Sequence, residues 1–143
     1  MTIQQDVQRL LDLEDIKQLK ARYFRLIDTK QWDELATVFA ENVDAQYSRS
    51  RGSLTSPSAV VEFIRNAVHP VPTVHHGHMP EIEITGDSAR GIWAMADMVG
   101  REGTDLVMRG YGHYHEEYVR TADGWKIRSL RLTRLRVDNK VNP

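Results

Sequence analysis

The chain has 143 residues, 41% of them hydrophobic, and a formal net charge of −1 from 19 basic and 20 acidic residues. This length suits one domain with one core, so we expect residues 1–143 to form a single domain. The balanced charge offers no basic surface for a phosphate backbone, which argues against a nucleic-acid partner. No apolar run is long enough to span a membrane. The chain has no cysteine, which excludes disulfides and thiolate chemistry and favours a cytoplasmic protein.

The first predicted element is a long amphipathic helix ending near residue 28. Its apolar side chains recur at helical spacing, and the pattern places Lys17, Lys20 and Arg22 mostly off the apolar stripe. Leu10 and Leu11 also point off the stripe, which predicts a bend or a separate first turn near Leu13. The stripe itself consists of Ile16, Leu19, Tyr23, Leu26 and Ile27.

Two shorter helices are predicted before residue 72. The first lies within residues 32–39, where apolar side chains recur at helical spacing and the acidic Asp33 and Glu34 stand in the first turn. The second begins with Ser56 as N-cap and Pro57 in the first turn, and it stops before Pro70.

The rest of the chain has the pattern of long strands joined by hairpin turns. Helices followed by strands predict an α+β fold, and strands of this length predict a strongly curved antiparallel sheet. We expect a cone-shaped sheet wrapped around a pocket and covered by the three N-terminal helices. The predicted strands lie within residues 81–85, 89–99, 106–120 and 125–137, and the turns within 86–87, 101–103 and 123–124.

Three residues suggest acid/base chemistry. Tyr23 and Asp28 lie at the end of the long helix, and His75 lies in the segment TVHHGHMPEIEI. A carboxylate beside an imidazole moves protons near neutral pH without a cofactor, and a phenol can polarise a carbonyl group. On a regular helix Tyr23 and Asp28 would not share a face, so Asp28 is expected where the helix ends and the chain turns toward the pocket.

Three stretches of the chain resemble the SnoaL-like branch of the nuclear transport factor 2 superfamily, which includes polyketide cyclases, scytalone dehydratase, bile-acid dehydratase and a dehydrochlorinase. The resemblance covers nearly the whole chain and implies an α+β cone with a deep cavity. Fold alone does not name a reaction. The stretches are RYFRLIDTKQWDELATVFAENV, TVHHGHMPEIEITGDSARGIWAMAD and GYGHYHEEYVRTADGWKIRSLRLTRLRV.

The resemblance implies roles for five catalytic candidates. Asp28 and His75 match the carboxylate and the imidazole of the acid/base dyad in those relatives, and Tyr23 and Tyr47 resemble their two tyrosines. Asp97 matches a cavity-facing Asp or His. An Asp at the C-terminal end of a helix also feels the negative end of the helix dipole, which disfavours its charged form.

A second group of residues is expected to bind the substrate. Tyr114 matches a tyrosine that the family usually carries. Trp93 and Met95 could instead be ordinary core residues. Arg131 could orient an anionic substrate, or it could be solvated or paired with Glu116 or Glu117. The complete set of expected substrate-binding residues is Trp93, Met95, Tyr114, Phe63 and Arg131.

A metal site is the competing interpretation of the histidines. His76, His78, His113 and His115 could offer four imidazoles from two strands. Strand alternation places His76 and His78 on the face opposite His75. Because helices that precede the strands do not fit a jelly roll, we expect no metal and no cofactor.

One strand face is apolar throughout, because Ala94, Ala96 and Met98 alternate with Trp93, Met95 and Asp97. An apolar face on the side of the sheet without helices predicts a homodimer or a homotrimer.

These observations predict a cofactor-independent lyase or isomerase, similar to a dehydratase or cyclase, acting on a small cyclic and largely apolar molecule. Asp28 and His75 would supply the acid/base chemistry. The alternative is a non-catalytic small-molecule-binding or assembly domain of the same fold.

Overall fold

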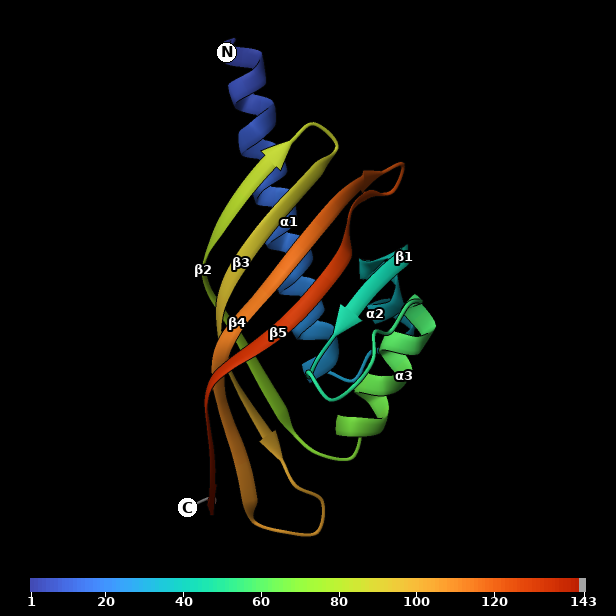
Figure 1. Ribbon diagram of the computed structural model, residues 1–143, viewed down its shortest axis with the longest axis vertical. Coiled ribbons are helices and arrows are strands. Elements are labelled where there is room, and N and C mark those ends of the chain that lie inside the picture. The colour runs from blue at the N-terminus through green and yellow to red at the C-terminus, as the bar shows by residue number, and fades with distance from the viewer. Residues whose placement is uncertain (142–143) are drawn as a thin grey trace.

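The long N-terminal helix is continuous. The computed structural model describes residues 1–141, and α1 extends over Ile3–Asp28. The Thr2 side chain accepts a hydrogen bond from the backbone N–H of Gln5 and the Gln5 side chain accepts one from Thr2, so a capping box begins the helix. The separate first turn that was the alternative to a bend near Leu13 is wrong, because α1 is one helix from Ile3. The first turns of α1 instead project beyond the sheet (Figure 1), which leaves Leu10 and Leu11 exposed.

The other helices are short. The second predicted helix consists of α2 (Trp32–Leu35) and a 3-10 turn (Ala36–Val38). The third is confirmed as α3 (Pro57–Val68), where the Ser56 hydroxyl accepts a hydrogen bond from the Ala59 N–H at 3.1 Å. Between them lies a strand that the sequence pattern did not predict, β1 (Phe39–Gln46).

Five strands form one curved sheet in the order β1-β5-β4-β3-β2 (Figure 1). The predicted α+β cone is confirmed, but one pairing differs from the expected antiparallel sheet, because β1 pairs with β5 in parallel. The remaining neighbours are antiparallel. These strands are β2 (Thr73–Thr85), β3 (Ser88–Gly100), β4 (Leu106–Thr121) and β5 (Gly124–Val141).

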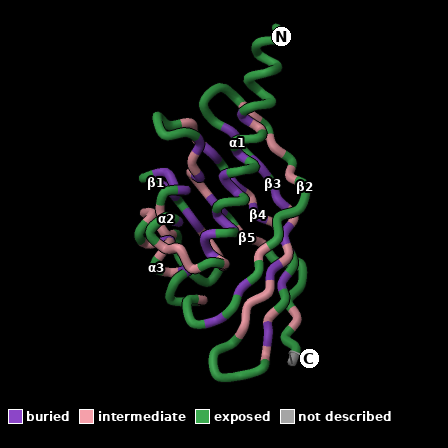
Figure 2. Tube along the Cα trace, turned by 180° about the vertical axis from the view of Figure 1, so that it is seen from behind, coloured by how far each residue is buried: buried purple, intermediate pink, exposed green. Residues whose placement is uncertain are grey.

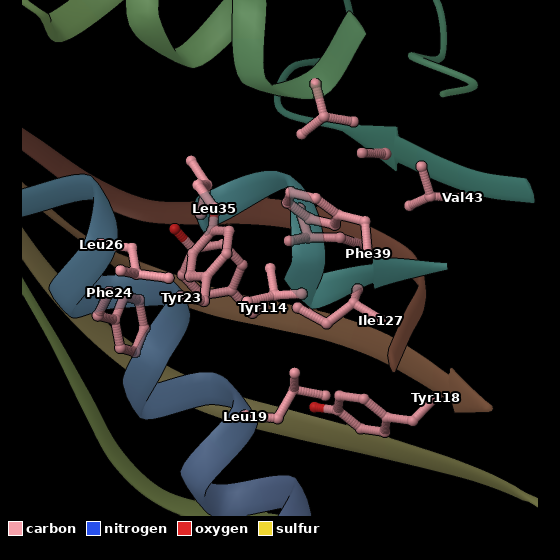
Figure 3. Packing of buried hydrophobic residues seen from close by; sticks show 14 of the residues in the cluster. Leu19, Tyr23, Phe24, Leu26, Leu35, Phe39, Val43, Tyr114, Tyr118 and Ile127 are labelled. Atoms are coloured by element: carbon pink, nitrogen blue, oxygen red, sulfur yellow. The ribbon is translucent and has the colours of Figure 1, made fainter. Parts of the chain in front are cut away.

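The core lies between α1 and the inner face of the sheet. Tyr23 and Tyr114 pack edge to face with ring centroids 5.9 Å apart, and Figure 3 shows them between α1 and the strands, beside Phe24 and Phe39. Buried and exposed positions alternate along the central strands, whereas the first turns of α1 are exposed throughout (Figure 2). Among residues 1–141, no helix has the length and apolarity needed to cross a membrane.

Candidate active site

Asp28 is the last residue of α1, and the turn that follows aims its carboxylate at the sheet. Lys30 has a positive φ of 60°, and the backbone N–H of Gln31 returns to the carbonyl oxygen of Leu26 at 2.8 Å. A left-handed residue with such a returning hydrogen bond closes a helix. The chain therefore leaves the helix directly after Asp28, in agreement with the prediction from the sequence.

The Asp28 carboxylate accepts three hydrogen bonds from β2. Its Oδ1 receives one from the Thr73 hydroxyl at 2.9 Å and lies 2.6 Å from Nδ1 of His75. Its Oδ2 receives the backbone N–H of His75 at 2.9 Å. The Lys30 ammonium group donates a hydrogen bond to the Thr73 hydroxyl oxygen at 3.1 Å. The Thr73 hydroxyl proton is therefore available for the hydrogen bond to Asp28. This arrangement fixes the acid against the imidazole.

The hydrogen bonds also assign the His75 tautomer. Because an ionised carboxylate can only accept, Nδ1 of His75 carries the proton and Nε2 has the free lone pair. Nε2 makes no hydrogen bond to another residue of the described chain, 1–141. The ring stacks on Phe24 with centroids 5.8 Å apart and an interplanar angle of 14°, which holds its plane. Nε2 is therefore a positioned proton acceptor.

The charged form of Asp28 is favoured. Burial opposes it, but the hydrogen bonds from His75 and Thr73 outweigh burial and hold the pKa of Asp28 below its ordinary value. This direction is opposite to the one expected from the helix dipole alone, because three close donors act more strongly than the dipole.

The lowered pKa of Asp28 should make the free energy of unfolding depend on pH. We expect the free energy of unfolding that Asp28 contributes to be fully present above its unfolded-state pKa of 3.8 and to be lost as the pH falls through the lower folded-state pKa. Urea unfolding of the wild type and Asp28→Asn between pH 7 and pH 2 measures this. The difference in unfolding free energy should shrink on the acid side, and a difference independent of pH would contradict the assignment.

The dyad lines an open pocket of about 830 Å³ between α1 and β2. Gly77 leaves room for its aromatic wall, because an added Cβ there would lie 2.6 Å from Cε2 of Phe24 and 3.3 Å from Cε3 of Trp93. The expected substrate-binding residue Trp93 is part of this wall. The full lining consists of Lys17, Lys20, Ala21, Phe24, Arg25, Asp28, Thr29, His75, His76, Gly77, His78, Met79, Pro80 and Trp93.

The three predicted tyrosines lie elsewhere. The hydroxyls of Tyr23 and Tyr47 are 2.8 Å apart, and Tyr114 packs beside Tyr23 in the core. None of the three lines the pocket that holds Asp28 and His75. Burial raises the pKa of each phenol well above its usual value, so these hydroxyls stay protonated at neutral pH.

Four other predicted residues are also separate from this pocket. Met95 is buried in the core, and Phe63 lines a depression beside α3. Arg131 borders a groove on the outer face of the sheet. The Asp97 carboxylate forms a bidentate ion pair with the Arg134 guanidinium group, with N–O distances of 2.7 and 2.9 Å. The structure therefore brings together Asp28, His75 and Trp93 but not the complete predicted set.

A buried ion pair at the wall of the pocket is not among the predicted site residues. Lys20 donates a hydrogen bond to Glu116 at 2.9 Å, and both side chains are fully buried. The prediction that Lys20 lies mostly off the apolar stripe is therefore wrong. Burial lowers the pKa of Lys20 to about 8, against the opposing effect of Glu116. The other Glu116 oxygen accepts from the Tyr118 hydroxyl at 2.8 Å, and that hydroxyl accepts from the Trp93 indole N–H at 2.9 Å. The pair is thus connected to the pocket wall.

The histidines do not converge on one site. His76 and His78 are exposed and line the same pocket as His75, in spite of strand alternation, where the β2–β3 pairing becomes irregular between Gly77 and Pro80. His115 lies on the outer face of β4, 3.2 Å from the Thr133 hydroxyl. No group of three or more His, Asp or Glu residues within 1–141 is arranged to hold a metal ion.

A helix laid across a curved mixed sheet is the arrangement of the cone fold of nuclear transport factor 2-like proteins. Solved structures with this fold include two from Novosphingobium species. The hexachlorocyclohexane dehydrochlorinase LinA-type3 of Novosphingobium barchaimii has a TM-score of 0.86 and 19% identity, covering 96% of both chains. A provisional scytalone dehydratase of Novosphingobium aromaticivorans has a TM-score of 0.85 and 18% identity, covering 94% of both. At these identities the likeness shows the fold.

Sequence comparison gives the family. The model of the SnoaL-like domain matches residues 8–131, so the chain belongs to the SnoaL-like domain family. A protein of Gibberella zeae named probable cyclase FGR4 is 27% identical over 133 residues, covering 84% of this chain and 89% of that protein. The predicted family is confirmed.

Proposed function

We propose that the chain is a cofactor-independent lyase or isomerase that uses Asp28 and His75 for proton transfer. The observation that carries the proposal is the 2.6 Å contact between His75 Nδ1 and Asp28 Oδ1 at the wall of a pocket of about 830 Å³. The names of the relatives, a cyclase, a dehydratase and a dehydrochlorinase, agree with a lyase or isomerase type of reaction.

His75 starts the reaction in this proposal. Its Nε2 removes a proton from carbon next to a carbonyl or another activating group, and the ring becomes an imidazolium. Asp28 stabilises that cation through Nδ1–H without taking the proton. The imidazolium then returns its proton, either to the departing group in an elimination or to a different carbon in an isomerisation. No other group is needed to balance the protons.

The substrate class follows from the pocket. Phe24, Trp93, Met79 and Pro80 supply apolar and aromatic surface, which suits a small cyclic molecule. Tyr23, Tyr47 and Asp97 remain predicted catalytic residues, but no step depends on them because they do not line this pocket.

Isotope exchange tests the reaction type. Small cyclic ketones and β-hydroxyketones incubated with the protein in D₂O should gain deuterium at the activated carbon or lose water, which ¹H NMR follows. Conversion of such a compound without cleavage of that C–H bond would contradict proton abstraction by His75.

We also propose a homodimer or a homotrimer formed through the outer face of the sheet. Ile92 and Tyr111 are exposed there, and the half-buried Ala94, Ala96 and Met98 continue the apolar surface. Sedimentation analysis of the wild type and Ala96→Glu tests this, since a charge in such an interface should produce a monomer.

A further inference from the structure

One wall of the candidate active-site pocket carries a row of positive charge. Lys17, Ala21 and Arg25 line the pocket and follow one another at intervals of four along the exposed face of α1. Residues at this spacing lie on one side of a helix, and eight residues rise about 12 Å along its axis. The two cations therefore stand on either side of a small residue that does not obstruct access.

These two charges are not neutralised by the residues around them. Neither Lys17 nor Arg25 forms an ion pair within the described residues 1–141. Asp28 is the one acid in the described lining, and its oxygens are occupied by Thr73 and His75. The charge of Lys20 is balanced by Glu116. The pocket therefore has an excess of positive charge along its α1 wall.

The surface behind this row is aromatic and rigid. Phe24 is fixed between His75 and Gly77, and the Trp93 indole N–H is held by the Tyr118 hydroxyl at 2.9 Å. Fixed aromatic side chains suit a planar ring, and a pair of unpaired cations at the edge suits an anionic substituent on it.

We propose that this pocket selects a planar cyclic substrate that bears a carboxylate, with the ring beside Phe24 and Trp93 and the carboxylate at the Lys17–Arg25 row. The proposal rests on the proposed function, because it places the ring of the substrate next to His75. It adds a requirement for negative charge to the apolar, cyclic substrate.

Ligand titration tests the proposal with 2-naphthoate and its neutral counterpart 2-naphthamide. Binding is followed through the Trp93 indole N–H signal in ¹H–¹⁵N NMR spectra, assigned by Trp93→Phe. We expect naphthoate to bind about three- to tenfold more tightly than naphthamide at low salt. This preference should vanish in Lys17→Gln/Arg25→Gln protein. The matched control is Arg9→Gln/Arg22→Gln, which removes two exposed charges of α1 outside the pocket and should keep the preference.

Three results would overturn the proposal: equal affinity for the two compounds, a preference that survives in Lys17→Gln/Arg25→Gln, or a Trp93 signal that neither compound shifts. The titrations are repeated in His75→Ala protein, which the proposed function expects to be inactive. Binding does not require turnover. Loss of the preference for naphthoate in His75→Ala protein would therefore count against the proposed substrate carboxylate and not against proton transfer by His75. Retained turnover in His75→Ala would count only against the proposed function.

Discussion

Replacing His75 by alanine is expected to lower turnover by about 10²- to 10⁴-fold, the usual contribution of a positioned general base. The imidazole is the group whose free nitrogen meets the substrate in the proposed reaction, and its Nδ1 is held 2.6 Å from Asp28. Asp28→Asn should also reduce kcat strongly, because an amide cannot stabilise the imidazolium as a carboxylate does. Steady-state kinetics on a substrate found by isotope exchange measures both effects.

His76→Ala is the matched control for this prediction. His76 is an exposed imidazole in the same pocket but has no hydrogen bond to Asp28, so its loss should leave kcat close to that of the wild type. Circular dichroism should show that all three variants are folded. Equal losses in His75→Ala and His76→Ala would mean that the dyad has no special role.

The second large effect concerns stability. Lys20→Met or Glu116→Met should each lower the free energy of unfolding by about 3–5 kcal/mol, because either change leaves a buried charge without its partner. The ammonium of Lys20 also lies 3.5 Å from the Tyr114 ring centroid and 3.9 Å from that of Tyr23, and these contacts are lost with it. Urea unfolding at pH 7 measures the change.

The double variant Lys20→Met/Glu116→Met separates a charge effect from a packing effect. Removing both charges should restore most of the stability, because apolar pairs often replace buried ion pairs at little cost. Arg90→Gln is the surface control, since Arg90 pairs with Glu83 in an exposed position and its loss should change stability little. A double variant as unstable as the sum of the single ones would contradict the prediction.

Local signals predicted most elements of the fold. Ser56 and Pro57 mark the start of α3 through a hydrogen bond and a fixed φ angle that depend only on neighbouring residues. By contrast, β1 is stabilised by pairing with β5, and Phe39 lies opposite Ile127. Nothing in residues 39–46 themselves indicates a parallel partner so far along the chain, which is why this strand was not predicted.

The candidate site was predicted in part for a related reason. The resemblance to a family indicated Asp28 and His75, but the positions of Tyr23 and Tyr47 relative to the pocket depend on how α1 packs on the sheet. Lys20 could have been recognised, because it follows Ile16 by four residues and precedes Tyr23 by three, the spacing of the buried stripe. Lysine side chains usually face solvent, and this general preference predicts an exposed Lys20.

The tautomer of His75 tests the central claim most directly, because it needs no substrate. Long-range ¹H–¹⁵N NMR of the histidine rings, with His75 assigned through His75→Ala, distinguishes a protonated Nδ1 from a protonated Nε2. We expect the neutral form of the His75 ring to carry its proton on Nδ1 in the wild type and to lose this preference in Asp28→Asn. A wild-type ring protonated on Nε2, or a signal unchanged by Asp28→Asn, would contradict the positioned acid/base pair.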